Sequence, residues 1–170
     1  MELNILPEAS PILHEACERF NFDTPQLDAK DFAESLYTLM VKCDGLGLSA
    51  NQVGHKVQAF AIRIDDDSPT VLFNPKVVDR SDKFINMKEG CLSYPLLFLN
   101  IGRPDSVRIR FQDYTGVMQT KQFIGLSARV ALHELDHLQG VTYTHRDVVS
   151  SFELNRAMRK RMILKRKVKK

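Results

Sequence analysis

The clearest periodic pattern of apolar residues lies between positions 28 and 42. Its apolar side chains recur at helical spacing and share one face, namely Phe32, Leu36, Leu39 and Met40. Polar and charged residues occupy most of the intervening positions, and Gly45 follows the run. Such a pattern is typical of an amphipathic helix whose apolar face packs in the core. We therefore predict a helix over residues 28–42.

Two pairs of apolar segments predict β-hairpins. Residues 57–64 and 70–73 are rich in Val, Ile, Phe and Ala, and they flank the polar, proline-containing segment 65–69. Residues 107–112 and 117–123 flank a shorter polar turn that ends in glycine. We interpret the acidic segment 65–69 as a hairpin tip, because it lacks the glycine and the later acidic ligand of a calcium-binding loop.

Helical spacing returns in the second half of the chain. We predict a helix over residues 126–138, with Gly140 near its end, and a last helix close to the C-terminus. In that last helix Leu154, Met158 and Met162 recur at intervals of four residues, so we expect them to pack on the body of the protein. The order of helix, strands and helices favours an α+β fold with mainly antiparallel sheet.

Length and composition are those of one domain. The chain has 170 residues, enough to bury a core of its own, and no uninterrupted apolar stretch is long enough to span a bilayer. Residues 1–10 carry no basic region followed by an apolar run, so we expect a cytoplasmic protein without membrane contact. We also expect a monomer. The three cysteines, Cys17, Cys43 and Cys91, form no short-spaced framework and are expected to be reduced.

The net charge of +3 conceals an uneven distribution. Residues 156–170 contain nine Lys or Arg and no acidic residue, which leaves 15 basic against 21 acidic side chains in the rest of the chain. A basic terminal segment is commonly a solvated helix face, and it is equally suited to contact a polyanion such as ribosomal RNA. We keep both interpretations for residues 151–170, which we assign to the same domain as residues 1–150.

The strongest chemical signal is His133-Glu134-Leu135-Asp136-His137. Histidines four residues apart on a helix project from one face, so both imidazoles can bind a single metal ion. Glu134, beside the first histidine, is close enough to exchange a proton with a metal-bound water. The pattern is typical of a hydrolytic metal site, which needs a third protein ligand.

Three positions compete for the role of third ligand. An extended metalloprotease motif would place histidine at position 143, where this chain has Tyr143. Other zinc peptidases use a glutamate from a later helix, and Glu153 is the only glutamate after the motif. Cys91 is the favoured candidate, because a thiolate is a strong ligand for a borderline-soft metal and the segment around it is too short for a helix.

Three separated blocks of the chain resemble the peptide deformylase family. They are Gly45-Leu46-Gly47-Leu48-Ser49-Ala50-Asn51-Gln52, Glu89-Gly90-Cys91-Leu92-Ser93 and His133-Glu134-Leu135-Asp136-His137-Leu138-Gln139-Gly140. Their order and spacing are similar to those of the family, over about residues 1–150. The resemblance implies a catalytic domain in which strands surround the motif helix. It also implies an enzyme that removes the formyl group from the N-terminal formylmethionine of new polypeptides.

The resemblance further implies a metal centre and a mechanism. The ligands would be Cys91, His133 and His137, and the metal is usually Fe²⁺ in this family, although Zn²⁺, Ni²⁺ and Co²⁺ suit the same donors. Metal-bound water would attack the formyl carbonyl, with Glu134 acting first as general base and then as general acid. Gln52 and the backbone N–H of Leu92 would stabilise the oxyanion.

The residues around the substrate are also implied by the resemblance. The pocket for the methionine side chain would be formed by Leu46, Met87, Leu126, Val130 and His133. Gly45, Gly47, Glu89 and Gly90 would border the substrate, and the glycines would let a peptide backbone lie close. Glu89 could equally stiffen the Cys91 loop by hydrogen bonds, and Asp136 with Arg103 is a candidate ion pair near the ligands.

Three classes of function are open from the residues alone. A deformylase requires Cys91 and Gln52, whereas a zinc peptidase would use Glu153 and leave Cys91 dispensable. A non-catalytic metal- or RNA-binding module would depend on the basic tail. The joint presence of the three blocks favours the deformylase, with formyl-Met nascent chains as substrates.

Overall fold

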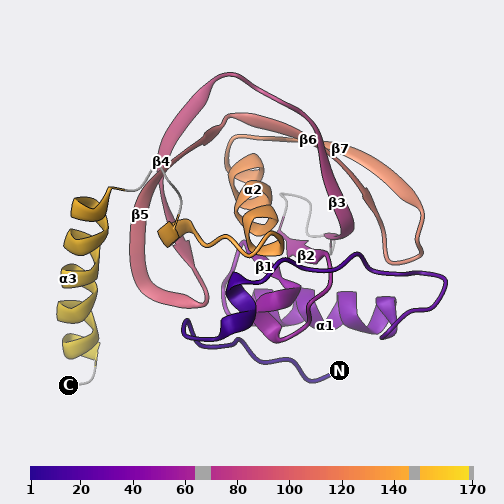
Figure 1. Ribbon diagram of the computed structural model, residues 1–170, viewed down its shortest axis with the longest axis horizontal. Helices are drawn as coiled ribbons and strands as arrows, with labels where there is room; N and C mark the ends of the chain where they lie inside the picture. The colour runs from indigo at the N-terminus through magenta and orange to yellow at the C-terminus, as the bar shows by residue number, and fades with distance from the viewer. Residues whose placement is uncertain (64–69, 146–149, 169–170) are drawn as a thin grey trace.

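The computed structural model describes residues 1–63, 70–145 and 150–168 (Figure 1). Its helices are α1 (Ala29–Lys42), α2 (Leu126–Leu138) and α3 (Ser151–Val168), and its 3-10 turns are η1 (Pro11–His14), η2 (Ala50–Val53) and η3 (Tyr143–His145). Its strands are β1 (Gly47–Ser49), β2 (Ala59–Ile62), β3 (Thr70–Arg80), β4 (Phe84–Cys91), β5 (Tyr94–Pro104), β6 (Ser106–Gln112) and β7 (Met118–Ile124). These strands all pair antiparallel, so the predicted α+β class with antiparallel sheet is confirmed.

Two sheets surround α2. Five strands form one sheet in the order β1-β2-β3-β6-β7, and β4 pairs with β5 in a second sheet. Figure 1 shows the long strands arching over α2, with α1 on the other side of β1 and β2. One buried cluster joins α1 to the first sheet and contains Phe32, Leu36 and Phe73. A second joins α2 to the strands and contains Ala131 and Ile109, so α2 is held from several sides.

The helix predicted from the first apolar pattern is α1. Asp28 caps its N-terminus, where the side chain accepts a hydrogen bond of 2.7 Å from the backbone N–H of Asp31. The predicted apolar face is buried at Phe32, Leu36 and Met40. This packing places the loop that follows α1, with its glycines, beside α2.

Both predicted hairpin pairings are present. Strands β2 and β3 pair with Ala61 opposite Val71, whereas the predicted tip at 65–69 lies outside the described residues. Strands β6 and β7 pair with Phe111 opposite Gln119. In their turn, a side-chain oxygen of Asp113 accepts hydrogen bonds from backbone N–H groups at 2.9 and 3.1 Å, which closes the loop.

Strands β4 and β5 were not predicted, although β4 carries the Cys91 motif. On β5, Leu97, Leu99 and Ile101 are buried at alternate positions, which is the pattern of a strand with one face in the core. The exposed Phe98 between them hides this alternation in the sequence. Most of β4 is exposed, so its sequence has little apolar periodicity to detect.

Helix α2 has the bounds predicted from its spacing. It ends before Gly140, which adopts a left-handed conformation with φ 73°. A side chain at Gly140 would approach the backbone of His14 and Glu15 to 2.8 Å, so only glycine allows the two segments to pass this closely. The backbone N–H of Cys17 then donates to Leu138 at 2.8 Å, which ties the end of α2 to the N-terminal segment.

Helix α3 is present, but the predicted packing face is confirmed only at Leu154 and is wrong for the two methionines. Met158 and Met162 are exposed. Leu154 and Ala157 instead pack against a third buried cluster, which includes Leu97, Ile101 and Tyr143. Arg161 completes that face, where it donates to the carbonyl of Pro95 at 2.8 Å and to Glu8.

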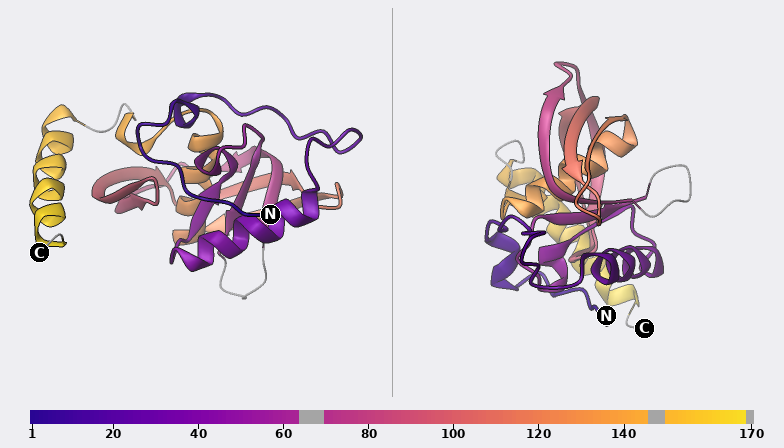
Figure 2. Two further views of the ribbon diagram at one scale, coloured as in Figure 1. Left: turned by 90° about the horizontal axis from the view of Figure 1, so that it is seen from below. Right: turned by 90° about the vertical axis from the view of Figure 1, so that its right-hand side faces the viewer.

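The difference has a physical reason. The surface that faces α3 carries the Pro95 carbonyl and the Glu8 carboxylate, which both accept hydrogen bonds. Arginine can donate to both of these groups, whereas methionine has no donor. Helix α3 lies alongside β5 at one end of the molecule (Figure 2). Among the described residues, no helix is long and apolar enough to cross a membrane.

Candidate metal centre and its cavity

The three predicted metal ligands come together from two elements. Cys91 ends β4, whereas His133 and His137 lie one turn apart on α2. One donor atom from each residue lies within 4.8 Å of the other two, and Cys91 Sγ is 3.3 Å from His137 Nε2. Among the described residues, no other cluster of three or more His, Cys, Asp or Glu side chains has donor atoms close enough to bind one metal ion. Glu153, the alternative third ligand, lies on α3 outside this group.

The donor set fits a tetrahedral divalent ion. Metal–sulfur and metal–nitrogen bonds of typical length place a thiolate sulfur and an imidazole nitrogen about 3.6 Å apart. The observed 3.3 Å between Cys91 and His137 is close to this spacing. Burial, together with the neighbouring His133, holds the pKa of His137 well below its usual range, so its ring is neutral and able to donate a lone pair.

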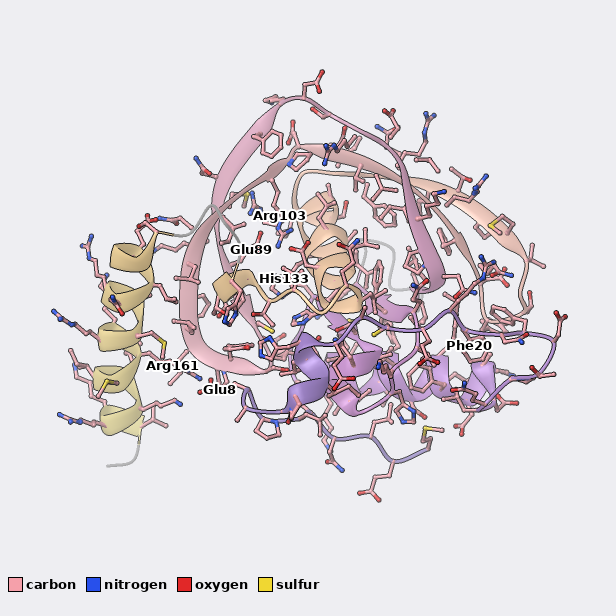
Figure 3. The ribbon with its side chains drawn as sticks, viewed as in Figure 1. Glu8, Phe20, Glu89, Arg103, His133 and Arg161 are labelled. Carbon is pink, nitrogen blue, oxygen red and sulfur yellow. The ribbon has the colours of Figure 1, made fainter. Side chains whose placement is uncertain are left out.

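Glu89 orients the first histidine. Its carboxylate lies 3.0 Å from Nδ1 of His133 and accepts hydrogen bonds from Arg103 at 2.5 and 2.9 Å; Figure 3 labels these three residues. The carboxylate also accepts a hydrogen bond from Arg129 at 2.6 Å. Burial opposes its ionisation, but the hydrogen bonds from His133 and Arg103 outweigh burial and lower the pKa of Glu89 to about 2. With Nδ1 of His133 held by a carboxylate, Nε2 is left to face the metal position.

His133 itself binds protons tightly in this setting. Burial acts to lower its pKa, but the hydrogen bonds to Cys91 and Glu89 outweigh burial and raise the pKa of His133 to about 10. A metal ion that binds at Nε2 of His133 must therefore displace a proton.

A buried charge network supports the ligands. Arg103 donates to Asp136 at 2.9 Å as well as to Glu89, which is the pairing considered from the sequence. Arg103 is 2% exposed, so its charge is stable there only because both carboxylates face it. The contact between Arg129 and Glu89, which belongs to the same network, was not predicted from the sequence. Residues far apart in the chain make these contacts, and no local spacing signals them.

Glu134 is a buried carboxyl beside the predicted metal ligands. It is 3% exposed, and its Oε2 atom has no hydrogen-bond partner among the described residues. Burial raises the pKa of Glu134 to about 7, against the opposing effect of His133. Gly47 leaves room for this side chain, because a Cβ there would lie 2.9 Å from Cδ of Glu134 and 2.7 Å from Val130. This close approach explains a glycine in the first motif block.

Gln52 is held with its amide nitrogen toward the centre. Its Oε1 atom accepts from the backbone N–H of Ser49 at 3.0 Å and from the Ser49 hydroxyl at 2.9 Å. Its Nε2 atom therefore points the other way, 3.4 Å from Cys91 Sγ and 3.1 Å from the hydroxyl of Ser93. Asn51, a residue of the first motif block with no predicted role, donates to the carbonyl of His137 at 2.6 Å and anchors the end of α2.

A cavity of about 420 Å³ opens beside the centre. The predicted substrate-binding and oxyanion residues that line it are Gly45, Leu46, Gly47, Gln52, Glu89, Gly90, Leu92, Leu126 and Val130. Cys91, His133 and Glu134 also line it, together with residues that were not predicted, namely Asp44, Lys88, Tyr94, Pro95, Leu96, Leu97, Phe98 and Arg129. The walls are largely apolar, which suits an apolar side chain.

Met87 is the exception among the predicted pocket residues. It is 41% exposed and does not line the cavity. The Cα atoms of strand residues two apart are separated by about 6.6 Å. Met87 is thus one strand step beyond Glu89, toward solvent, and its role in the methionine pocket stays a prediction.

Known proteins are similar to this chain in sequence. A family model described as polypeptide deformylase matches residues 2–153. The chloroplastic peptide deformylase 1B of Oryza sativa subsp. japonica is 38% identical over 157 residues, which cover 88% of this chain and 57% of the relative. Peptide deformylase 1 of Bacillus cereus is 33% identical over 144 residues, which cover 84% of this chain and 90% of the relative.

Solved structures agree with the sequence relatives. A peptide deformylase from Synechococcus elongatus, in complex with actinonin, has a TM-score of 0.85 and 32% identity, covering 94% of this chain and 86% of that one. A plant peptide deformylase has a TM-score of 0.84 and 33% identity, covering 98% and 90%. The chain spans about half the length of the three plant relatives it matches, 57, 51 and 54%.

Proposed function

The chain belongs to the polypeptide deformylase family, and we propose on that basis that it hydrolyses the N-terminal formamide of formylmethionine-initiated polypeptides. The observation that carries the proposal is the Cys91, His133 and His137 group with Glu134 beside it in the wall of a largely apolar cavity. Acyl-group hydrolysis needs a base, an activated water and oxyanion donors in one place, and this cavity supplies candidates for each.

Glu134 is the proposed proton carrier. A divalent metal bound by Cys91, His133 and His137 would lower the pKa of a coordinated water and polarise a carbonyl. Glu134 would accept the proton that the attacking water loses and would later deliver it to the departing amine. A carboxyl with a pKa near 7 is suited to both steps, because it gives up and takes a proton close to neutral pH.

Gln52 and Leu92 are the proposed oxyanion donors. When the formyl carbon becomes tetrahedral, its oxygen gains negative charge and needs donors that are already in position. The two hydrogen bonds from Ser49 fix the amide of Gln52 in this orientation. Leu92 lines the cavity next to Cys91, which supports its backbone N–H as the second donor. Removal of one such donor typically costs about 3 kcal/mol of transition-state stabilisation.

The substrate test compares two acyl groups on one peptide. Formyl-Met peptides should be hydrolysed at least about tenfold faster than acetyl-Met peptides, because the extra methyl group would crowd the space between Glu134 and the ligands. The measurement is kcat/KM for both peptides with the same protein sample. Equal rates for the two, or no hydrolysis of formyl-Met peptides by metal-loaded protein, would contradict the proposal.

Iron is the proposed metal. A thiolate with two imidazoles suits Fe²⁺, Zn²⁺, Ni²⁺ and Co²⁺, so the donor set supports a divalent transition metal and the family resemblance supports Fe²⁺. Elemental analysis of protein purified without oxygen tests this assignment. Stoichiometric zinc without iron under those conditions would contradict it.

The basic face of α3 is the proposed contact with the ribosome. Replacement of five exposed residues by glutamine removes charge while keeping good helix formers, and it spares the buried Arg161. The five are Arg159, Lys160, Lys165, Arg166 and Lys167. We expect unchanged turnover of short formyl-peptides, with weaker and less salt-dependent co-sedimentation with ribosomes.

The matched control removes five exposed basic residues from the body of the protein. These are Lys30, Lys76, Arg80, Arg108 and Arg110, all replaced by glutamine. This variant should co-sediment like the parent. If the parent fails to co-sediment with ribosomes even at low salt, or if the control variant loses binding equally, α3 does not bind the ribosome and is only a solvated helix.

The cytoplasmic location and the monomeric state stay predictions. Fractionation of cells that express the protein and sedimentation of the purified protein would test them. The relative from rice is named chloroplastic, so a plastid location is the alternative outcome.

A further inference from the structure

Leu96 has a backbone conformation that its residue type avoids. Its φ is 65°, in the left-handed region where glycine, asparagine and aspartate are the usual residues. Within the described part of the chain, the other two non-glycine residues with positive φ are Asp44 and Asn74, which tolerate this region. A left-handed backbone disfavours a residue such as leucine by about 5- to 30-fold. Contacts from other parts of the structure must therefore hold Leu96 in this conformation.

Leu96 lies in a bulge of β5, where the pairing with β4 is irregular. The register shifts between Glu89 and Cys91, so four residues of β5, 95–98, stand opposite one residue of β4. All four residues of this bulge line the cavity beside the metal centre. Because regular strand pairing does not fix the bulge, the shape of this cavity wall depends on other contacts.

Two side chains from the C-terminal part of the chain hold the bulge on either side of Leu96. The hydroxyl of Tyr143 donates to the carbonyl of Leu97 at 2.9 Å. Nε of Arg161 donates to the carbonyl of Pro95 at 2.8 Å. Both donors are buried, at 1% and 4% exposed. A hydrogen bond from a charged group contributes about as much as the left-handed backbone costs, or more, so Arg161 is able to offset that cost.

Arg161 is itself fixed from two sides. Its Nη2 atom donates to the carboxylate of Glu8 in the N-terminal segment, and Figure 3 labels both residues. Ala157 and Leu154, one and two turns earlier on α3, pack against the buried cluster that contains the other anchor, Tyr143. The ring centroid of Tyr143 lies 5.5 Å from that of a proposed metal ligand, whereas Arg161 does not line the cavity. Arg161 can therefore be replaced without direct disturbance of the metal centre.

We propose that Arg161 is a positioning residue for the substrate cavity, which keeps Leu96 left-handed through the Pro95 carbonyl and thereby fixes the wall formed by the bulge. The inference rests on the proposed deformylase function, because the wall acts only when a peptide binds against it. Without Arg161, the backbone at Leu96 returns to extended conformations, and a smaller fraction of molecules presents the competent wall. The apparent affinity for substrate falls with that fraction, whereas the metal ligands and Glu134 stay in place.

The test measures kcat and KM of the metal-loaded protein for a formyl-Met tripeptide. Arg161→Met keeps an unbranched side chain and a good helix former, and it removes the donor to Pro95. KM should rise about tenfold, while kcat stays within twofold of the parent value. A substitution that only destabilised the fold would instead reduce the number of active molecules, which lowers kcat and leaves KM unchanged.

Leu96→Gly tests whether the effect of Arg161 passes through Leu96. Glycine adopts the left-handed conformation without a steric cost, so the bulge no longer needs the anchor. Leu96→Gly alone sets the baseline, because it also removes a side chain from the wall. In the Leu96→Gly background, Arg161→Met should raise KM less than threefold.

Arg159→Met is the matched control, because it removes the same side chain from an exposed position of the same helix. Its kcat and KM should equal those of the parent. Arg161→Lys is the second variant, since it keeps the charge beside Glu8 but its single ammonium cannot replace separate donors at Nε and Nη2. It should raise KM in the same direction, and it decides the matter if Arg161→Met does not fold.

The outcomes separate this inference from the proposed function. Hydrolysis of the formyl-Met peptide by the parent, with KM of the folded Arg161 variants within twofold of the parent, would overturn the role of Arg161 alone. An equal rise of KM in the Leu96→Gly background, or in the Arg159→Met control, would also overturn it. Failure of the metal-loaded parent to hydrolyse the peptide would overturn the proposed function, and with it the assignment of a substrate wall.

Discussion

Replacement of Glu134 by glutamine should lower the turnover of a formyl-Met peptide by about 10²- to 10⁴-fold and leave the bound metal in place. Glutamine has nearly the same shape, so Gly47 and Val130 still accommodate it. Its amide cannot accept the proton that the attacking water loses, and it cannot return one to the departing amine. The measurement is metal content and turnover on the same sample, so that loss of metal is not mistaken for loss of the base.

The matched control is Glu153→Gln. Glu153 is exposed on α3 and is the glutamate that a zinc peptidase of this motif type would need as its third ligand. We expect full metal content and full turnover in this variant. Turnover of Glu134→Gln within tenfold of the parent would remove Glu134 from the proposed mechanism. A loss of metal in the control would instead favour the peptidase.

Local patterns were sufficient to predict the elements whose core face is apolar. The helix at 28–42 and the helix at 126–138 follow from side chains three and four residues apart, which the structure buries together. The β6–β7 hairpin follows from two apolar runs around a polar turn. These signals depend on neighbours along the chain, so no tertiary information is needed to read them.

The failures occur where a distant segment decides the outcome. Helix α3 packs through Arg161 against Pro95 of β5 and against Glu8, which lie 66 and 153 positions earlier in the chain. Because these partners are polar, an arginine and not an apolar residue is buried there. Strand β4 is largely exposed and is a strand because β5 pairs with it. Arg129, which no motif indicates, donates to the carbonyls of Ile101 and Ile85 on the paired strands.

The candidate site divides in the same way. The two histidines and Glu134 follow from one helical turn, and the sequence alone placed them together. The contacts of Glu89 join β4, β5 and α2. Arg129 takes part in these contacts, and no sequence motif predicts this role. Cys91 was selected by the chemistry of its sulfur and by resemblance, and its distance to the histidines became measurable only in three dimensions.

Replacement of Cys91 by serine should lower both metal content and activity, with metal affinity reduced by more than about 100-fold. Loss of a group that merely supports a ligand already costs about 10- to 100-fold, and a hydroxyl is a far poorer ligand than a thiolate for a borderline-soft metal. Serine keeps the size of the side chain and can still accept from Gln52, so the fold around β4 should survive. The change therefore reports on the sulfur as a ligand. Metal affinity is measured by competition with a chromophoric chelator.

The control for that substitution is Cys43→Ser, which changes a half-buried cysteine at the end of α1, outside the donor group. It should bind metal and turn over substrate like the parent, which separates the effect of one particular thiolate from that of losing any thiol. Because Glu134 stays in place in Cys91→Ser, activity per bound metal tells whether the sulfur also tunes the reaction beyond holding the ion. If Cys91→Ser retained full metal and full rate, the third ligand would lie elsewhere, and Glu153 would become the residue to replace next.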